Sequence, residues 1–265
     1  MFLALRHWAF PLAIFFVMFS AVCMAQNTTF TGPILVQADK PIAPPEPADF
    51  RVRYATNPLG ETIGMNARYL TLDGKPWLPV MGEFHYARVP ESQWEDEILK
   101  MKAAGVQIIS TYVFWIHQEE VEGQFDWSGR RNLRHFVQLC AKHGMYVWLR
   151  IGPWDHGEVR NGGFPDWLLK KVPSNDLRRD DPLFMHYVNA FYKQIGKQVN
   201  GLMWDQGGPI IGVQLSNEYA MHGPGEGDAY IIALKKIAVA SGFHVPIFSV
   251  TGWGSGGLRL CPREQ

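Results

Sequence analysis

The sequence is poor in cysteine and has no excess of charge of either sign. Its 265 residues include three cysteines, and 25 basic side chains balance 25 acidic ones, giving a formal net charge of zero. Balanced charge gives no support for a nucleic-acid partner or an anionic membrane surface. The few cysteines exclude a disulfide framework. Because 47% of the residues are hydrophobic, we expect a globular chain with one large core.

Signals for metals and nucleotides are also missing. His and Cys residues are scattered rather than grouped at metal-ligand spacing, and no GxxxxGK phosphate-binding motif occurs. We therefore predict that the protein uses neither a metal nor another cofactor. The sequence carries no signal for the oligomeric state.

One long hydrophobic run lies near the N-terminus. Arg6 and His7 precede an apolar stretch from Trp8 to Val22, and Cys23-Met-Ala25 supplies small residues at a cleavage position. This pattern predicts a secretory signal peptide at residues 1–25. The run is short for a membrane span. We expect export to a periplasm or beyond the cell, without stable membrane insertion after the signal is removed.

The next segment, residues 26–49, is rich in proline and predicts an extended lead-in. From residue 50 onward the pattern changes to alternating strands and helices. Residues 68–76 predict a hairpin, because a strand-like run ends at Asp73-Gly74 and Asp-Gly favours tight hairpin turns. We expect this hairpin to cover the bottom of a barrel.

Strand-like and helical stretches then alternate to the end of the chain. The expected strands are 77–84, 106–115, 145–151, 209–215 and 245–250, and the expected helices lie in 93–104, 129–143, 165–200 and 227–241. Such alternation predicts a parallel α/β fold. Aromatic and ionisable residues gather where the strands end, which favours a barrel mouth over the single crevice of a doubly wound sheet. We therefore predict a (β/α)8 TIM barrel over residues 50–265, truncated after about five βα units.

The strand at 209–215 ends in an amide and a carboxylate, Asn217 and Glu218. Its apolar residues do not alternate with polar ones, as expected for a parallel strand that is covered on both faces. Residues at the carboxyl ends of barrel strands point into the active site, so Glu218 is a candidate catalytic group. The alternative is structural, with Glu218 capping the next helix or pairing with a lysine.

A series of motifs extends this pattern from about residue 68 to residue 253. They are Gly82-Glu-Phe-His-Tyr-Ala-Arg-Val-Pro90, Lys100-Met-Lys-Ala-Ala-Gly105, Thr111-Tyr-Val-Phe-Trp115, Gly152-Pro-Trp154, Gly162-Gly-Phe-Pro-Asp-Trp-Leu-Leu169, Gly207-Gly-Pro-Ile-Ile211 and Asn217-Glu-Tyr219. Together they resemble the β-galactosidases of glycoside hydrolase family 35. The resemblance implies a (β/α)8 barrel that hydrolyses terminal β-D-galactosides with retention of configuration.

The resemblance also implies roles for individual residues. Glu218 would be the acid/base and Asn217 would bind the 2-hydroxyl of the sugar. The remaining residues predicted to bind substrate are Tyr112, Glu158, Trp115 and Gly157. In the family a second glutamate on a later strand is the nucleophile, and we find no counterpart after Glu218. We therefore expect this polypeptide by itself to be inactive, as the product of a truncation or a shifted reading frame. Residues 256–265 show no strand or helix pattern.

Two departures from the family pattern affect the substrate. Ile116-His-Gln-Glu-Glu120 stands where the family has Asn-x-His-Glu-Pro, and His156-Gly-Glu-Val159 stands where it has Cys-Ala-Glu-Trp. The wall that recognises galactose is therefore altered. Galactosyl side chains of plant cell-wall oligosaccharides are one hypothesis for the substrate. Two alternatives remain, namely another retaining barrel glycosidase (mannanase, cellulase or glucosaminidase-like) and a non-catalytic carbohydrate-binding protein.

Neighbouring charged residues have simpler interpretations. Glu83 either contacts substrate or pairs with Arg88, and Arg150 is expected to be a structural ion-pair partner. The acidic loop at 119–122 is expected to be solvated.

Overall fold

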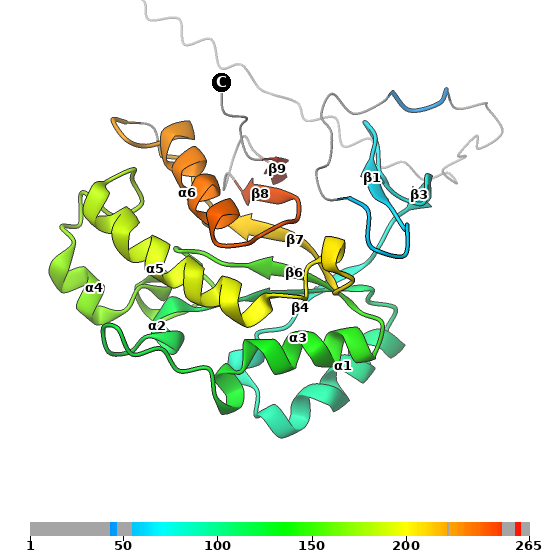
Figure 1. The fold of residues 1–265 in the computed structure, drawn as a ribbon, viewed down its shortest axis with the longest axis horizontal. Helices are drawn as coiled ribbons and strands as arrows, with labels where there is room; N and C mark the ends of the chain where they lie inside the picture. The colour runs from blue at the N-terminus through cyan, green and yellow to red at the C-terminus, as the bar shows by residue number, and fades with distance from the viewer. Residues whose placement is uncertain (1–42, 47–54, 222, 251–257, 261–265) are drawn as a thin grey trace, which may run out of the picture. The chain divides into compact units, whose positions relative to one another are not determined.

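The computed structural model describes residues 43–46, 55–221, 223–250 and 258–260 (Figure 1). The chain divides into two compact units, Met1–Ala43 and Pro44–Gln265. All the helices and strands below belong to the second unit. The predicted signal peptide and most of the predicted lead-in lie outside the described residues.

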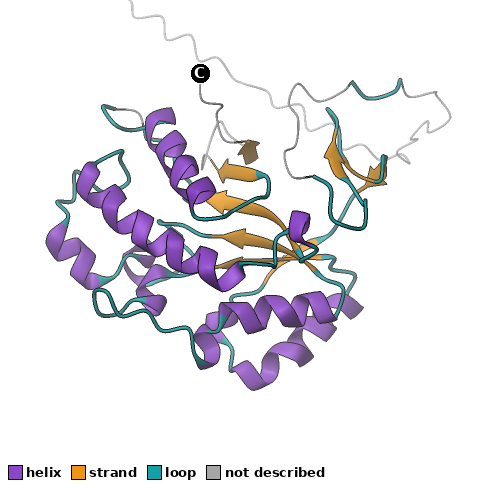
Figure 2. Cartoon of the chain, viewed as in Figure 1, coloured by secondary structure: helices purple, strands orange, loops and turns teal. Residues whose placement is uncertain are grey.

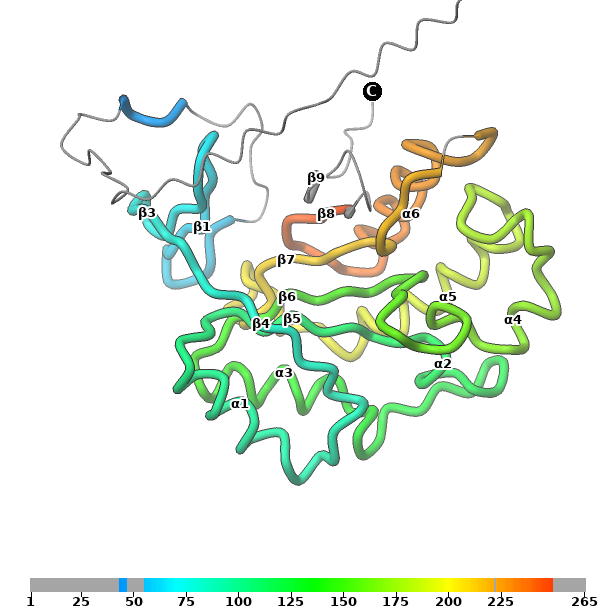
Figure 3. Tube along the Cα trace, turned by 180° about the vertical axis from the view of Figure 1, so that it is seen from behind, coloured from blue at the N-terminus to red at the C-terminus, as the bar shows by residue number. Residues whose placement is uncertain are grey.

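The second unit contains a six-stranded sheet with the strand order β4-β5-β6-β7-β8-β9. Its strands are β4 (Met81–Glu83), β5 (Ile108–Tyr112), β6 (Tyr146–Arg150), β7 (Ile210–Leu215), β8 (Ile247–Val250) and β9 (Leu258–Leu260). Strands β4 to β8 are parallel and adjacent in chain order, and Figure 3 shows this succession from behind. Strand β9 pairs antiparallel with β8. No strand was expected in 256–265, so β9 corrects that expectation for residues 258–260, and the rest of the range lies outside the described residues.

Within the described residues, six α-helices accompany these strands. They are α1 (Trp94–Ala103), α2 (Trp115–Gln118), α3 (Leu133–Lys142), α4 (Asp166–Lys171), α5 (Pro182–Val199) and α6 (Asp228–Ala240). Side chains cap two of them: the amide oxygen of Asn132 accepts from the backbone N–H of His135, and Asp181 Oδ1 accepts from that of Phe184. Pro182 opens α5, where its missing N–H costs nothing.

Helices α1, α3, α5 and α6 lie on one face of the sheet (Figures 1 and 2). Helix α3 packs between α1 and α5, and α5 also packs against α6. A doubly wound sheet carries helices on both faces, whereas a barrel wall carries them outside only. One-sided helices and sequential parallel strands confirm the predicted α/β fold, consistent with part of a (β/α)8 barrel.

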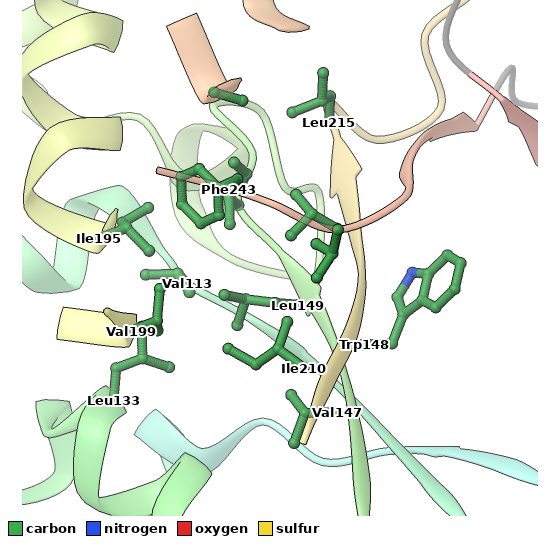
Figure 4. Close-up of a cluster of buried hydrophobic side chains, with 14 of the residues drawn as sticks. Val113, Leu133, Val147, Trp148, Leu149, Ile195, Val199, Ile210, Leu215 and Phe243 are labelled. Carbon is green, nitrogen blue, oxygen red and sulfur yellow. The ribbon is translucent and has the colours of Figure 1, made fainter. Parts of the chain in front are cut away.

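The strand register assigns side chains to the two faces. Val147 and Leu149 of β6 point toward Ile195 and Val199 of α5, while Trp148 points to the opposite side of the strands (Figure 4). The Trp148 ring lies against Gly212 of β7, its register partner, where a Cβ atom would be 2.6 Å from the ring. Trp148 also contacts Phe248 of β8, with ring centroids 4.5 Å apart. Large and small residues (Trp148, Gly212 and Phe248) thus alternate across neighbouring strands on the face of the sheet away from α5.

A separate three-stranded antiparallel sheet precedes β4. It consists of β1 (Ile63–Met65), β2 (Leu70–Leu72) and β3 (Lys75–Trp77). Asp73 and Gly74 link β2 to β3 with φ values of 51° and 73°, as a type I′ hairpin turn requires. The predicted hairpin is confirmed. The ring of Trp77 contacts that of Tyr146 at the amino end of β6, with centroids 5.2 Å apart. The small sheet therefore lies at the amino ends of the strands.

Two element boundaries differ from the prediction. The expected strand 77–84 is divided between β3 and β4, because Leu78 to Val80 connect the two sheets. The expected strand 106–115 ends at Tyr112, and Trp115 begins the short helix α2.

Candidate active site

Polar side chains gather at the carboxyl ends of β4 to β7, which we call the rim. The register pairs Tyr112 of β5 with Arg150 of β6, and Arg150 with Gln214 of β7. These three side chains therefore project from the same face, next to the row that contains Trp148. Carboxyl ends of barrel strands carry the active site in this class of fold.

Arg150 is the centre of this group. Its guanidinium donates to Glu83 Oε2 at 3.0 Å and to Asn217 Oδ1 at 2.6 Å. The carbon Cζ lies 3.7 Å from the centroid of the Tyr112 ring. Gln214 Nε2 donates to Asn217 Oδ1 as well, at 3.0 Å. The predicted structural role of Arg150 as an ion-pair partner is confirmed.

Glu83 is held by Arg150 and His85. Its Oε1 lies 3.2 Å from His85 Nε2. Burial by itself would raise the pKa of the Glu83 carboxyl, but the His85 contact and the Arg150 charge outweigh it and the pKa is lowered. The expected pairing with Arg88 was wrong. Arg88 instead donates to the carbonyl oxygens of Gly157 at 2.6 Å and Glu158 at 3.0 Å.

The chain leaves β7 in an unusual conformation. Ser216 and Glu218 have φ values of 39° and 46°, a region that L-residues seldom occupy. The loop after β6 holds this segment, because Ser216 N–H donates to Gly152 O at 2.7 Å and Asn217 N–H to Trp154 O at 2.8 Å. Gly152 O also accepts from the buried Tyr192 hydroxyl at 2.6 Å.

The carboxylate of Glu218 faces this same loop. Its Oε2 lies 3.0 Å from His156 Nδ1, and the Glu218 side chain is 35% exposed. This contact is neither a helix cap nor a pairing with a lysine, so it does not favour the structural alternative. In the sequence, His156 lies in the motif 156–159 that departs from the family pattern, and that departure indicates an altered sugar wall but no partner for Glu218.

Gly157 and Glu158 lie in the loop after β6. Gly157 is buried, and a Cβ at this position would be 2.7 Å from the Phe114 ring, so only glycine fits without displacing that ring. The Glu158 side chain is exposed and its φ is 49°. The two Arg88 hydrogen bonds fix the backbone of both residues.

Tyr112 and Trp115 have different environments. Tyr112 is 5% exposed and stacks on Phe114, with centroids 5.4 Å apart, and burial raises the pKa of its hydroxyl. Trp115 is fully buried, stacks on Phe191 at 4.7 Å, and donates to Glu119 Oε2 at 2.7 Å. The structure therefore places Trp115 in the core, which corrects its assignment as a sugar contact.

The acidic loop also needs correction. Glu119 is 4% exposed, accepts hydrogen bonds from Trp115 and from the Gly123 N–H at 2.7 Å, and is not solvated. Burial raises its pKa. Glu120 and Glu122 form ion pairs with Arg131 and Lys171.

Asp155 is a buried carboxyl that sequence reasoning missed. It is fully buried, and within the described part of the chain neither side-chain oxygen has a hydrogen-bond partner. Burial raises its pKa well above the usual range. The Cα atoms of Gly152 and Gly163 approach it so closely that a Cβ on either would be 2.9 Å from a carboxyl oxygen.

The described residues contain neither a candidate metal-binding cluster nor a helix suited to span a membrane. No group of three or more His, Cys, Asp or Glu side chains there could hold a metal ion. Among the same residues, no helix has the length and apolar character needed to cross a membrane.

Comparisons with known proteins agree with this geometry. The sequence profile of glycosyl hydrolases family 35 matches residues 69–255. A beta-galactosidase of Xanthomonas manihotis is 36% identical over 189 residues, which cover 71% of this chain and 31% of that protein. A beta-galactosidase of Mus musculus is 37% identical over 180 residues, covering 68% of this chain and 28% of that protein. The chain thus spans less than a third of the length of these two curated relatives.

Among solved structures, an endo-1,4-beta-mannanase from Rhizomucor miehei aligns with a TM-score of 0.54 at 16% identity, covering 72% of this chain and 61% of that one. This likeness concerns the fold alone. The family profile covers most of the chain, including the strand ends described above, and the chain belongs to glycosyl hydrolases family 35.

Proposed function

We propose that this chain forms part of a retaining glycoside hydrolase that removes terminal β-D-galactosyl residues, with Glu218 as the acid/base. The observation that carries the proposal is the position of the Glu218 carboxylate, at the carboxyl end of β7 and 3.0 Å from His156. Family membership and relatives named beta-galactosidase support galactose as the sugar. Galactosylated plant cell-wall oligosaccharides are the proposed substrates.

The reaction needs a proton donor and a stabilising sugar site. Glu218 would protonate the departing oxygen, a step that general acids accelerate by about 10²–10⁴-fold. Both Arg150 and Gln214 donate to Asn217 Oδ1, so the amide keeps Nδ2 as its donor toward a sugar hydroxyl. Tyr112, the exposed Glu158 carboxylate and the backbone of Gly157 would contact further hydroxyls.

A retaining reaction also needs a nucleophilic carboxylate about 5–5.5 Å from the acid. The described rim carboxyls do not suit that role. Glu83 is paired with Arg150 and His85, and the buried Asp155 favours its protonated form. We therefore assign no nucleophile to the described residues, and we expect the 265-residue polypeptide to be inactive without an added nucleophile.

Sodium azide can replace a missing nucleophile and so tests the role of Glu218 directly. Azide would attack the anomeric carbon of an aryl β-galactoside, the bond to the aryl oxygen would break, and Glu218 would protonate that oxygen. The product is then α-galactosyl azide. With the phenyl galactoside, whose departure needs a proton, Glu218→Gln should lower the azide-dependent rate about 100-fold. With the 2,4-dinitrophenyl galactoside, which departs unprotonated, the rate should change far less.

Each outcome separates the alternatives. Equal losses on both galactosides in Glu218→Gln would contradict the acid/base role. Turnover of a β-mannoside in place of the galactoside would indicate a mannanase-like enzyme. Galactose binding without any azide product would indicate a carbohydrate-binding protein, and hydrolysis without azide would show that a nucleophile is present.

We also propose that the protein is exported to a periplasm or the cell exterior. The charged start, apolar run and small residues of 1–25 support this. N-terminal sequencing of the mature protein should begin at Gln26, and a mature chain that retains Met1 would contradict it.

A further inference from the structure

Arg178 lies between α4 and α5, in a segment to which neither the motifs nor the proposed reaction gave a role. Its guanidinium nitrogen NH2 donates to Asn217 O at 2.8 Å, and longer contacts reach Ser216 Oγ at 3.4 Å and Glu218 O at 3.5 Å. One side chain therefore contacts all three residues of the Ser216–Glu218 segment that carries the proposed acid.

Two aromatic rings hold the guanidinium in place. Its carbon Cζ lies 4.8 Å from the centroid of Trp154 and 5.2 Å from that of Tyr219. The Tyr219 hydroxyl donates to Arg178 O at 3.1 Å. Trp154 is itself fixed by Gly162, where a Cβ would be 2.3 Å from the ring. Arginine over aromatic faces is favourable, and more so when it is desolvated.

In the part of the chain that the structure describes, the guanidinium group of Arg178 interacts with this segment and is not ion-paired with a carboxylate. None of the ion pairs among the described residues involves it, and its Nε is buried without a hydrogen-bond partner there. Carbonyl oxygens and ring faces therefore replace the usual carboxylate. A partly buried cation without a paired anion is unusual, because desolvation of a charge is costly.

The segment that Arg178 contacts has an unfavourable backbone conformation. Ser216 and Glu218 both have positive φ, as does Arg178 itself at 58°. Such conformations cost about 1–3 kcal/mol each and persist only where the surroundings enforce them. The loop after β6 binds the N–H groups of Ser216 and Asn217, while Arg178 binds carbonyls of the same segment.

We propose that Arg178 is a positioning residue: by binding the carbonyl oxygens of Asn217 and Glu218 it keeps Ser216 and Glu218 at positive φ and aims the Glu218 carboxylate at the departing oxygen. This inference rests on the proposed function for the second half of the claim. The first half, that Arg178 holds the segment, can be tested without any turnover.

Amide hydrogen exchange tests the holding role on the 265-residue chain. In Arg178→Met, which keeps the apolar stem but loses every donor, the amides of Ser216 and Asn217 should exchange about tenfold faster. Amides of β5 and β6 should be unchanged. Arg160→Met is the matched control, since Arg160 is an exposed arginine in the loop after β6 that pairs with Asp166. Unchanged exchange at Ser216 and Asn217 would overturn the proposal whatever the activity.

The leaving-group comparison tests the aiming role. With azide, Arg178→Met should lower the rate on the phenyl galactoside about tenfold and leave the 2,4-dinitrophenyl rate within about twofold. Arg178→Lys, which keeps one charged donor, should recover part of the phenyl rate. A purely structural role would lower both rates equally, and that result would overturn the inference.

The two proposals fail in different ways. Suppose that Glu218→Gln shows the leaving-group difference and Arg178→Met does not. The acid/base role then stands and the positioning role is overturned. Suppose instead that Glu218→Gln shows no such difference. The proposed function then fails, the aiming role fails with it, and the exchange result alone decides whether Arg178 holds the segment.

Discussion

His156 Nδ1 lies 3.0 Å from Glu218 Oε2, joining the loop after β6 to the loop after β7 across the rim. The two side chains are 54% and 35% exposed. An exposed pair of this kind adds little stability, about 0–1 kcal/mol. Its effect should therefore appear in the reaction, through the orientation of the carboxylate, more than in folding.

Replacing His156 tests that expectation. His156→Ala should lower azide-dependent cleavage of the phenyl galactoside about tenfold, because the Glu218 carboxylate loses its orienting partner. The free energy of unfolding should change by less than about 1 kcal/mol. Urea titration and rate measurements on the same preparation give both values. His186→Ala, an exposed histidine on α5, is the control, and an equal loss of rate there would contradict the prediction.

Arg150 should matter for stability as well as for the site. Arg150→Met leaves Glu83 and Asn217 Oδ1 without their shared donor. Breaking a fully buried pair costs about 3–5 kcal/mol. Because the Glu83 side chain is 36% exposed, we expect Arg150→Met to lower the free energy of unfolding by about 2 kcal/mol. Chemical denaturation measures it, and a loss no larger than that of Arg160→Met would show that the Arg150 network contributes nothing to folding.

Asp155 predicts an unusual pH dependence. Its folded-state pKa is raised by burial, so the folded protein keeps a proton that the unfolded chain releases above about pH 4. The free energy of unfolding therefore falls as pH rises, by at most about 1.4 kcal/mol per pH unit, until the folded-state pKa is passed.

Asp155→Asn should abolish the part of the pH dependence of stability that comes from Asp155. The difference in unfolding free energy between Asp155→Asn and the unchanged protein should grow in favour of the variant as the pH rises above about 4. Asp180→Asn, at an exposed position, is the control substitution. A constant difference between Asp155→Asn and the unchanged protein would mean that Asp155 titrates normally.

The contact between Trp148 and Gly212 can be tested by a double-mutant cycle. Gly212→Ala places a Cβ where the ring now lies and should cost about 1–3 kcal/mol through overpacking. In a Trp148→Leu background, the same change should cost less. The coupling energy from urea titrations of the four proteins measures the contact. Full additivity would show that the two residues do not compete for the same space.

Local sequence was sufficient for the hairpin and the strand order. Asp73-Gly74 specified a turn through backbone conformations that few other residues adopt, and the runs of strand and helix formers specified a parallel α/β chain. Boundaries were less accurate. Trp115 reads as the end of a strand in the sequence but begins a helix, because its neighbours in the fold bury it against Phe191.

The site was predicted in part. Only the family resemblance indicated the Gly157-Glu158 pair, whereas local pattern placed Asn217, Glu218 and Tyr112 at strand ends. It gave no sign that Arg178 would contact the backbone at 216–218, since the two segments are far apart in the chain. Such contacts depend on which loops the sheet brings together.

The sequence by itself determined the kind of chain this is: balanced charge, a strand ending in a carboxylate, and family motifs in order. Only the tertiary structure decided which groups meet, placing His156 on Glu218, Arg150 between Glu83 and Asn217, and Trp115 in the core. The reason is physical. Propensity and periodicity act over a few neighbouring residues, whereas hydrogen bonding and burial at the rim join side chains from strands that are adjacent only after folding.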